Sequence, residues 1–136
     1  MQLKFLPSFV KRRGRITKKQ ESSLKLLPNY SVSKIDEINY ESKKYKMCNL
    51  EIGFGNAENL IYEAINNPSI LFIGSEVYLS GIGTLISNIK EKQIQNIRIF
   101  PEDIRLLFDQ EEKIIFNGIK IISVSYTHLR AHETRG

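Results

Sequence analysis

The 136-residue sequence predicts one α/β domain, built as a doubly wound parallel sheet with helices on both faces. A chain of this length favours a single domain with one modest core. From residue 46 onward, short apolar runs alternate with amphipathic stretches at the spacing of β/α units. The longest apolar runs, of about four residues, predict neither a membrane-spanning helix nor a secretory signal.

The first β/α unit is predicted at residues 47–66. A strand at residues 47–52 leads into a glycine turn, and Asn56 is placed to cap a helix that ends before Asn67-Pro68. Apolar residues recur at helical spacing, so we expect one face of this helix to carry Leu60, Ile61, Ala64 and Ile65.

Three further strands are predicted, at residues 70–76, 96–100 and 114–122. The helix after the second strand runs to about residue 92, and its apolar face holds Ile82, Leu85, Ile86 and Ile89. Asp103 is predicted to open a short helix whose apolar face holds Ile104, Leu107 and Phe108. The sheet is therefore expected to contain about four strands, all preceded by a basic N-terminal segment.

The net charge of +5 is unevenly distributed along the sequence. Residues 1–46 hold 12 Lys and Arg against 4 Asp and Glu, whereas residues 47–136 hold 8 against 11. We expect residues 1–45 to be a basic arm with a polyanionic partner. A solvated N-terminus without a partner is the alternative. A helical turn at residues 23–27 is the one local fold signal before residue 46.

The cysteine and histidine content argues against a metal site. The lone Cys48 excludes an internal disulfide and a cysteine-based zinc cage, and favours a reducing, cytoplasmic compartment. His128 and His132 lack a third ligand and lie in residues 123–136, which contain no Lys, Ile or Asn although these are common elsewhere. This tail resembles translated sequencing-adapter read-through, and we expect it to be foreign to the domain of residues 46–122.

Three acidic residues follow or end successive predicted strands. Glu51, Glu76 and Asp103 are separated by 25 and 27 residues, about one β/α unit each. Because the carboxyl ends of parallel strands meet at one edge of a sheet, the three carboxylates are expected along the edge where ligands bind. Ordinary helix caps or solvated loop acids are the alternative interpretation.

The acids and the glycines between them favour an adenosine-containing cofactor. A carboxylate at Glu76 suits a ribose diol, and Asp103 is placed to accept from the adenine amine. Gly53 and Gly55 let the backbone approach a ligand closely. Glu58 stands where a dinucleotide motif has its third glycine, and acids there favour the cationic S-adenosylmethionine over NAD.

Two stretches resemble the bacterial tRNA (guanine-N7)-methyltransferases. Residues 8–20, SFVKRRGRITKKQ, are similar to the family's basic S-F-V-x-R-x-G-R-x-T-x-x-Q segment. Residues 50–58, LEIGFGNAE, are similar to its L-E-I-G-F-G-x-G-E turn, with Ala57 where the family usually has glycine. The extra methyl of Ala57 is able to crowd the cofactor but does not have to exclude it. Residues 72–77, FIGSEV, and residues 81–83, GIG, continue the likeness.

The resemblance implies a Rossmann-like class I methyltransferase fold and S-adenosylmethionine as the cofactor. It implies methyl transfer to N7 of guanine 46 in tRNA. The implied cofactor-binding residues are Glu51, Gly53, Gly55, Glu76 and Asp103. Phosphate contacts to tRNA are expected from the basic segment, through Lys4, Lys11, Arg12, Arg13, Arg15, Lys18 and Lys19.

The resemblance ends after the fourth predicted strand. The family continues into a Phe-Pro-Asp-Pro-Trp motif whose aspartate serves the active site, whereas here Ile122 is followed by Ser-Val-Ser. No catalytic residue is therefore predicted in this chain. We expect an inactive or nearly inactive N-terminal part of the enzyme. A non-catalytic RNA-binding protein with a nucleotide-binding domain is the alternative.

Overall fold

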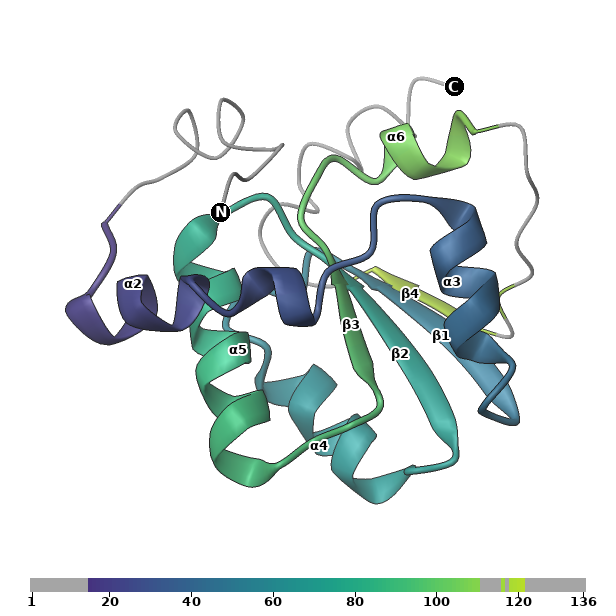
Figure 1. Ribbon diagram of the computed structural model, residues 1–136, viewed down its shortest axis with the longest axis horizontal. Helices are drawn as coiled ribbons and strands as arrows, with labels where there is room; N and C mark the ends of the chain where they lie inside the picture. The colour runs from purple at the N-terminus through teal and green to yellow at the C-terminus, as the bar shows by residue number, and fades with distance from the viewer. Residues whose placement is uncertain (1–14, 111–115, 117, 122–136) are drawn as a thin grey trace.

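Four parallel strands form the sheet in the computed structural model, which describes residues 15–110, 116 and 118–121. The strands lie in the spatial order β3-β2-β1-β4 (Figure 1). Their bounds are β1 Met47–Ile52, β2 Ile70–Ser75, β3 Ile97–Phe100 and β4 Gly118–Ile121. The chain moves outward from β1 to β3 and then returns to the other side of β1, so the strand order reverses at β1. Such a reversal is where ligands bind in doubly wound sheets.

Helices cover both faces of the sheet, as the sequence predicts (Figure 1). One face is covered by α4 and α5, with α2 packed on the outer side of α5. The other face is covered by α3 and α6. The helix bounds are α2 Lys18–Leu24, α3 Ile35–Ser42, α4 Glu58–Asn66, α5 Leu79–Lys92 and α6 Arg105–Phe108, and a 3-10 turn spans Leu27–Asn29.

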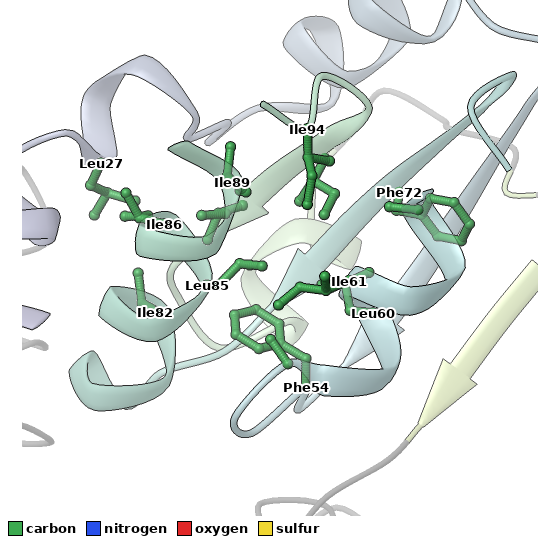
Figure 2. Close-up of a cluster of buried hydrophobic side chains, with 14 of the residues drawn as sticks. Leu27, Phe54, Leu60, Ile61, Phe72, Ile82, Leu85, Ile86, Ile89 and Ile94 are labelled. Carbon is green, nitrogen blue, oxygen red and sulfur yellow. The ribbon is translucent and has the colours of Figure 1, made fainter. Parts of the chain in front are cut away.

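The larger hydrophobic cluster lies between the sheet and helices α4 and α5 (Figure 2). Its buried side chains from the two helices include Leu60 of α4 and Leu85 of α5, and Phe72 of β2 packs among them. Leu27, which follows α2, belongs to the same cluster. Burial of this apolar surface therefore fixes α4 and α5 on the sheet and extends the core to the N-terminal segment.

The smaller cluster lies on the opposite face, beneath α3 and α6. Ile35 and Ile38 of α3, with Leu107 of α6, pack there against residues of β1, β2 and β3. Those strand residues are Cys48, Leu50, Leu71, Ile73 and Phe100. Because side chains alternate between the faces of a strand, β2 supplies both clusters, which explains its continuous apolar character.

The N-terminal segment is more ordered than the sequence analysis indicated. Instead of one turn at residues 23–27, the structure contains α2 and α3 before residue 46. Ser31 forms a parallel bridge with Ile99, and the Val32 N–H donates to the Ile99 carbonyl at 2.8 Å. The segment thus extends the sheet beyond β3 before α3 begins.

The predicted elements recur with small shifts of their ends. The cap of α4 is Ala57 rather than Asn56, although Asn56 Oδ1 still accepts from the Glu58 N–H at 3.3 Å. Ile65 is 51% exposed and Phe108 is 50% exposed, so both predictions of an apolar-face position were wrong. Each lies at the margin of its helix's apolar arc, beyond the reach of the sheet.

Several predictions fall outside the described residues. These are most of the predicted strand before residue 118, the tail at 123–136 with its two histidines, and residues 1–14. Within residues 15–110 and 118–121, no helix is long and apolar enough to cross a membrane.

Candidate functional site

The strand register brings the three predicted acids to the carboxyl edge of the sheet. Ile52 pairs with Ser75, and Ser75 pairs with Phe100, so these residues mark one line across β1, β2 and β3. Glu51 lies one residue before this line, Glu76 one residue after it and Asp103 three residues after it. The predicted arrangement of three acids on neighbouring strand ends is therefore present.

The glycine turn after β1 requires a backbone that other residues rarely adopt. Gly53 has φ of 68° and Gly55 has φ of 61°, both in the left-handed region. The Gly53 N–H donates to the Ser75 carbonyl at 2.7 Å, which holds the turn against the end of β2. The turn is thus a rigid extension of the sheet edge.

Glu76 is buried and its carboxylate holds the glycine turn. Oε1 accepts from the Gly55 N–H at 2.8 Å, and Oε2 accepts from the N–H groups of Val77 and Tyr78 at 3.1 and 3.3 Å. Burial raises the pKa of this carboxyl above its ordinary value, while the three backbone hydrogen bonds oppose the rise. The carboxylate therefore links the turn, the end of β2 and the start of α5.

Gly81 lets α5 approach the glycine turn. A Cβ at this position would lie 2.3 Å from the Gly55 carbonyl oxygen, a backbone atom that cannot move aside cheaply.

Glu51, the acid on the other side of the turn, is 1% exposed. Two buried carboxylates therefore flank a turn whose backbone is fixed from both sides.

Asp103 lies in a different environment from the two buried acids. Its carboxylate accepts from Arg105 Nε at 3.0 Å and Arg105 Nη2 at 2.5 Å, and Oδ1 also accepts from the Arg105 backbone N–H. The Arg105 side chain is 65% exposed. Asp103 is thus at the predicted edge but is engaged by a neighbouring guanidinium, which the sequence analysis did not foresee.

The basic residues predicted to contact tRNA are divided by the limits of the described chain. Arg15, Lys18 and Lys19 are described and all three are exposed. Lys4, Lys11, Arg12 and Arg13 lie outside the described residues. Among the described residues, no group of three or more His, Cys, Asp or Glu side chains is arranged to hold a metal ion.

Sequence reasoning missed the structural role of Thr17 and Gln20, which belong to the basic segment at residues 8–20. Thr17 and Gln20 form a capping box: the Gln20 N–H donates to Thr17 Oγ1 at 3.0 Å, and the Thr17 N–H donates to Gln20 Oε1 at 2.9 Å. A Thr-x-x-Gln sequence is a signal for the start of a helix. Applied to residues 17–20, that signal would have located α2.

The methyl group of Ala57 does not face an open site. Ala57 is fully buried in the larger cluster, with φ of 69° in the left-handed region. Crowding of a cofactor by this methyl stays a prediction. The left-handed backbone conformation is unfavourable for alanine and is easily adopted by glycine, which explains why glycine suits this position.

Comparison with known proteins identifies the family. Residues 45–123, more than half of the chain, match the family described as "Putative methyltransferase". The chain belongs to this methyltransferase family. The match covers the strands, the glycine turn and the three acids described above, so the resemblance found in the sequence motifs is confirmed.

Named relatives are similar over large parts of the chain. It is 42% identical over 83 residues to a tRNA (guanine-N(7)-)-methyltransferase of Wolbachia pipientis wMel, an alignment covering 60% of this chain and 38% of the relative. It is 31% identical over 131 residues to the enzyme of that name from Neorickettsia sennetsu, covering 96% of this chain and 58% of the relative. A bifunctional methyltransferase of Rickettsia prowazekii is 36% identical over 117 residues, 85% of this chain and 22% of the relative. The chain thus spans between about a fifth and three fifths of these relatives' lengths.

Solved structures support the fold. An antibiotic-related methyltransferase superposes with a TM-score of 0.54 at 18% identity, covering 65% of this chain and 46% of that one. The 16S rRNA methyltransferase KamB superposes with a TM-score of 0.55 at 13% identity, covering 71% and 46%. The α/β arrangement is therefore that of class I methyltransferases.

Proposed function

We propose that this chain binds S-adenosylmethionine at the carboxyl edge of its sheet and serves methyl transfer to N7 of guanine 46 in tRNA. The observation that carries the proposal is the pair of buried carboxylates, Glu51 and Glu76, on either side of the Gly53–Gly55 turn. The names of the relatives support tRNA as the substrate.

The residues of this edge fit a cationic adenosine cofactor. A buried carboxylate attracts positive charge more strongly than an exposed one, because water screens it less. Glu51 and Glu76 therefore favour a sulfonium and an amino group, and disfavour a pyrophosphate. Gly55 is partly exposed and has no side chain, so the backbone at this point of the turn is open to close approach by a ligand.

Each acid has a separate role in the proposal. Glu51 lies beside the turn, where its charge complements the cationic end of the cofactor. Glu76 already accepts three N–H groups, and its remaining acceptor capacity suits the ribose hydroxyls. Asp103 would accept from the adenine amine after exchanging with Arg105. That exchange costs little, because exposed ion pairs contribute between about 0 and 1 kcal/mol.

The proposed reaction depends mainly on aligning guanine N7 with the methyl group of the cofactor. S-adenosylmethionine, when bound, supplies a methyl group activated by the sulfonium. Guanine N7 carries an in-plane lone pair and needs no deprotonation, so no general base is required of this chain. The residues described here hold and orient the cofactor, which is the contribution that positioning makes to such a transfer.

The first experiment measures cofactor binding by isothermal titration with S-adenosylhomocysteine. We expect Glu51→Gln to weaken binding roughly tenfold or more, because it removes a buried negative charge that attracts the ligand's positively charged amino group. Glu58→Gln is the matched control, since Glu58 is an exposed acid in the first turn of α4. A folded wild-type chain that shows no heat of binding at millimolar ligand contradicts the proposal.

The second experiment incubates the chain with tRNA transcript and S-adenosylmethionine carrying a labelled methyl group. Formation of 7-methylguanosine, abolished in a transcript with adenosine at position 46, supports the full proposal. Methylation of another base or atom contradicts the assigned position. Cofactor binding without transfer would contradict the transfer part of the proposal and restrict the function of this chain to cofactor binding.

A further inference from the structure

One side of α2 is exposed and basic. Lys18, Lys19 and the C-cap residue Lys25 are exposed, and Arg15 precedes the helix. Glu21 is the one acidic residue in the helix. Lys18 and Lys25 are seven residues apart and therefore lie on the same side of the helix. The side of α2 that faces solvent thus carries a net positive charge suited to phosphates.

The opposite side of α2 is packed against α5 (Figure 1). Gln20 lies about 200° around the helix from Lys18, since each residue turns the helix by about 100°. Leu24, one turn further on from Gln20, packs against the larger hydrophobic cluster. The two sides of this short helix therefore have different partners.

Gln20 joins α2 to α5 by a side-chain hydrogen bond. Its Oε1 accepts from the Thr17 N–H, and its Nε2 donates to Thr84 Oγ1 of α5 at 2.9 Å. One side chain thus completes the capping box of α2 and fixes that helix end to a residue 64 positions away.

Gly83 provides the space for this contact. A Cβ at Gly83 would lie 2.9 Å from both the Cβ and the carbonyl oxygen of Gln20. On the same helix, Gly81 lies against the glycine turn, and the N–H groups of Val77 and Tyr78, just before α5, bind Glu76. A single helix therefore contacts α2 on one side and the candidate cofactor edge at its start.

We propose that Gln20 is a positioning residue, which holds the basic side of α2 at a fixed place relative to the cofactor edge so that it binds the phosphates of tRNA. This inference rests on the proposed function, because the polyanion is the proposed substrate. It adds Lys25 to the RNA-contacting residues, and it assigns Gln20 and Thr84 to orientation, with the charged residues supplying affinity.

The test measures binding of a fluorescent tRNA transcript to the full chain by anisotropy, at several salt concentrations. We expect Gln20→Ala to weaken RNA binding about three- to tenfold, because the basic side chains must then be ordered on binding. Thr84→Val, which removes the other end of the hydrogen bond at similar volume, should weaken it in the same direction. Lys25→Ala should lower the slope of log affinity against log salt by about one. Gln95→Ala is the control, as Gln95 is an exposed glutamine two residues before β3.

A second measurement separates positioning from a general loss of structure. Titration with S-adenosylhomocysteine should give the same dissociation constant for Gln20→Ala, Thr84→Val and the wild-type chain. If the wild-type chain binds RNA and both variants bind it equally well, the positioning role is wrong while the proposed function stands. If both variants lose RNA and cofactor binding together, Gln20 is structural and the inference also fails. If the wild-type chain binds cofactor but no RNA, the positioning role of Gln20 is wrong, and so is the part of the proposed function that names tRNA as the substrate.

Discussion

The residues at the sheet edge show how opposing effects act on one carboxyl group. Glu76 is buried, which disfavours its charged form, and it accepts three backbone N–H groups, which favour that form. Burial is the larger effect, so the pKa is raised. Asp103, by contrast, is balanced by the guanidinium of Arg105 near the surface. Carboxylates at two strand ends of the same edge therefore differ: that of Glu76 is buried and holds backbone N–H groups, whereas that of Asp103 is paired with a guanidinium near the surface.

The raised pKa of Glu76 predicts a pH dependence of stability. A carboxyl with a raised folded-state pKa stabilises the fold below its unfolded-state pKa, and that contribution is lost as pH rises through the folded-state pKa. The free energy of unfolding of the wild-type chain, relative to Glu76→Gln, should therefore fall from about pH 4 toward neutrality.

Urea unfolding of both chains at several pH values measures this difference, with Glu91→Gln on the exposed side of α5 as the control. A difference that instead rises with pH would mean that the hydrogen bonds from Gly55, Val77 and Tyr78 outweigh burial. The pKa of Glu76 would then be lowered, contrary to our expectation.

At the scale of elements, buried Asn96 joins the end of one β/α unit to the start of the next. Its Nδ2 donates to the carbonyls of Ala64 and Asn67, at the end of α4, both at 3.0 Å. It also donates to the carbonyl of Ile70, the first residue of β2, at 2.9 Å. The Ala64 and Asn67 carbonyls each also accept a backbone N–H, from Asn67 at 3.3 Å and from Ile70 at 3.1 Å, so the two hydrogens of the Asn96 amide, shared among three carbonyls, are additional donors at this buried junction.

Replacing Asn96 should therefore destabilise the connection between α4 and β2. We expect Asn96→Ala to lower the free energy of unfolding by about 1–3 kcal/mol. Asn96→Asp should lower it further, because a carboxylate would face carbonyl oxygens. Asn66→Ala is the control, since Asn66 makes an exposed hydrogen bond to the Tyr62 carbonyl within α4. Chemical denaturation measures all three, and an Asn96→Ala chain as stable as the control would show that water replaces the amide.

At the scale of the whole molecule, the sheet with its two hydrophobic clusters forms a continuous structure from Ile16 to Leu107. Cys48 of β1 lies in the smaller cluster, and burial raises the pKa of its thiol to about 11. Because the thiolate is the reactive form, Cys48 is protected both by burial and by its protonation. Its reactivity therefore reports opening of the fold.

We expect Cys48 to react slowly with a disulfide reagent at pH 8 in the native chain and rapidly in urea. If S-adenosylhomocysteine binds the folded chain only, it makes opening of the fold rarer. The native labelling rate should then be divided by one plus the ratio of ligand concentration to dissociation constant. Absorbance of the released thiol follows the reaction. Labelling at the rate of a free thiol would contradict the burial of Cys48. Labelling that is slow but unaffected by a bound ligand would show local opening near β1.

The sequence alone determined much of the sheet and its edge. Apolar periodicity located β1, β2, β3 and their helices to within a few residues, because each element must bury a face that its own spacing defines. The β/α spacing of Glu51, Glu76 and Asp103 then placed three acids at one edge, since parallel strands all end there.

The tertiary structure alone decided which of these groups touch. The bond from Gln20 to Thr84 and those from Asn96 to α4 join residues 64 and about 30 positions apart, and no local pattern encodes such partners. Likewise, only packing shows that Gly81 accommodates the Gly55 carbonyl and Gly83 accommodates Gln20. Periodicity reports what each segment buries, whereas close contacts depend on where the other segments come to lie.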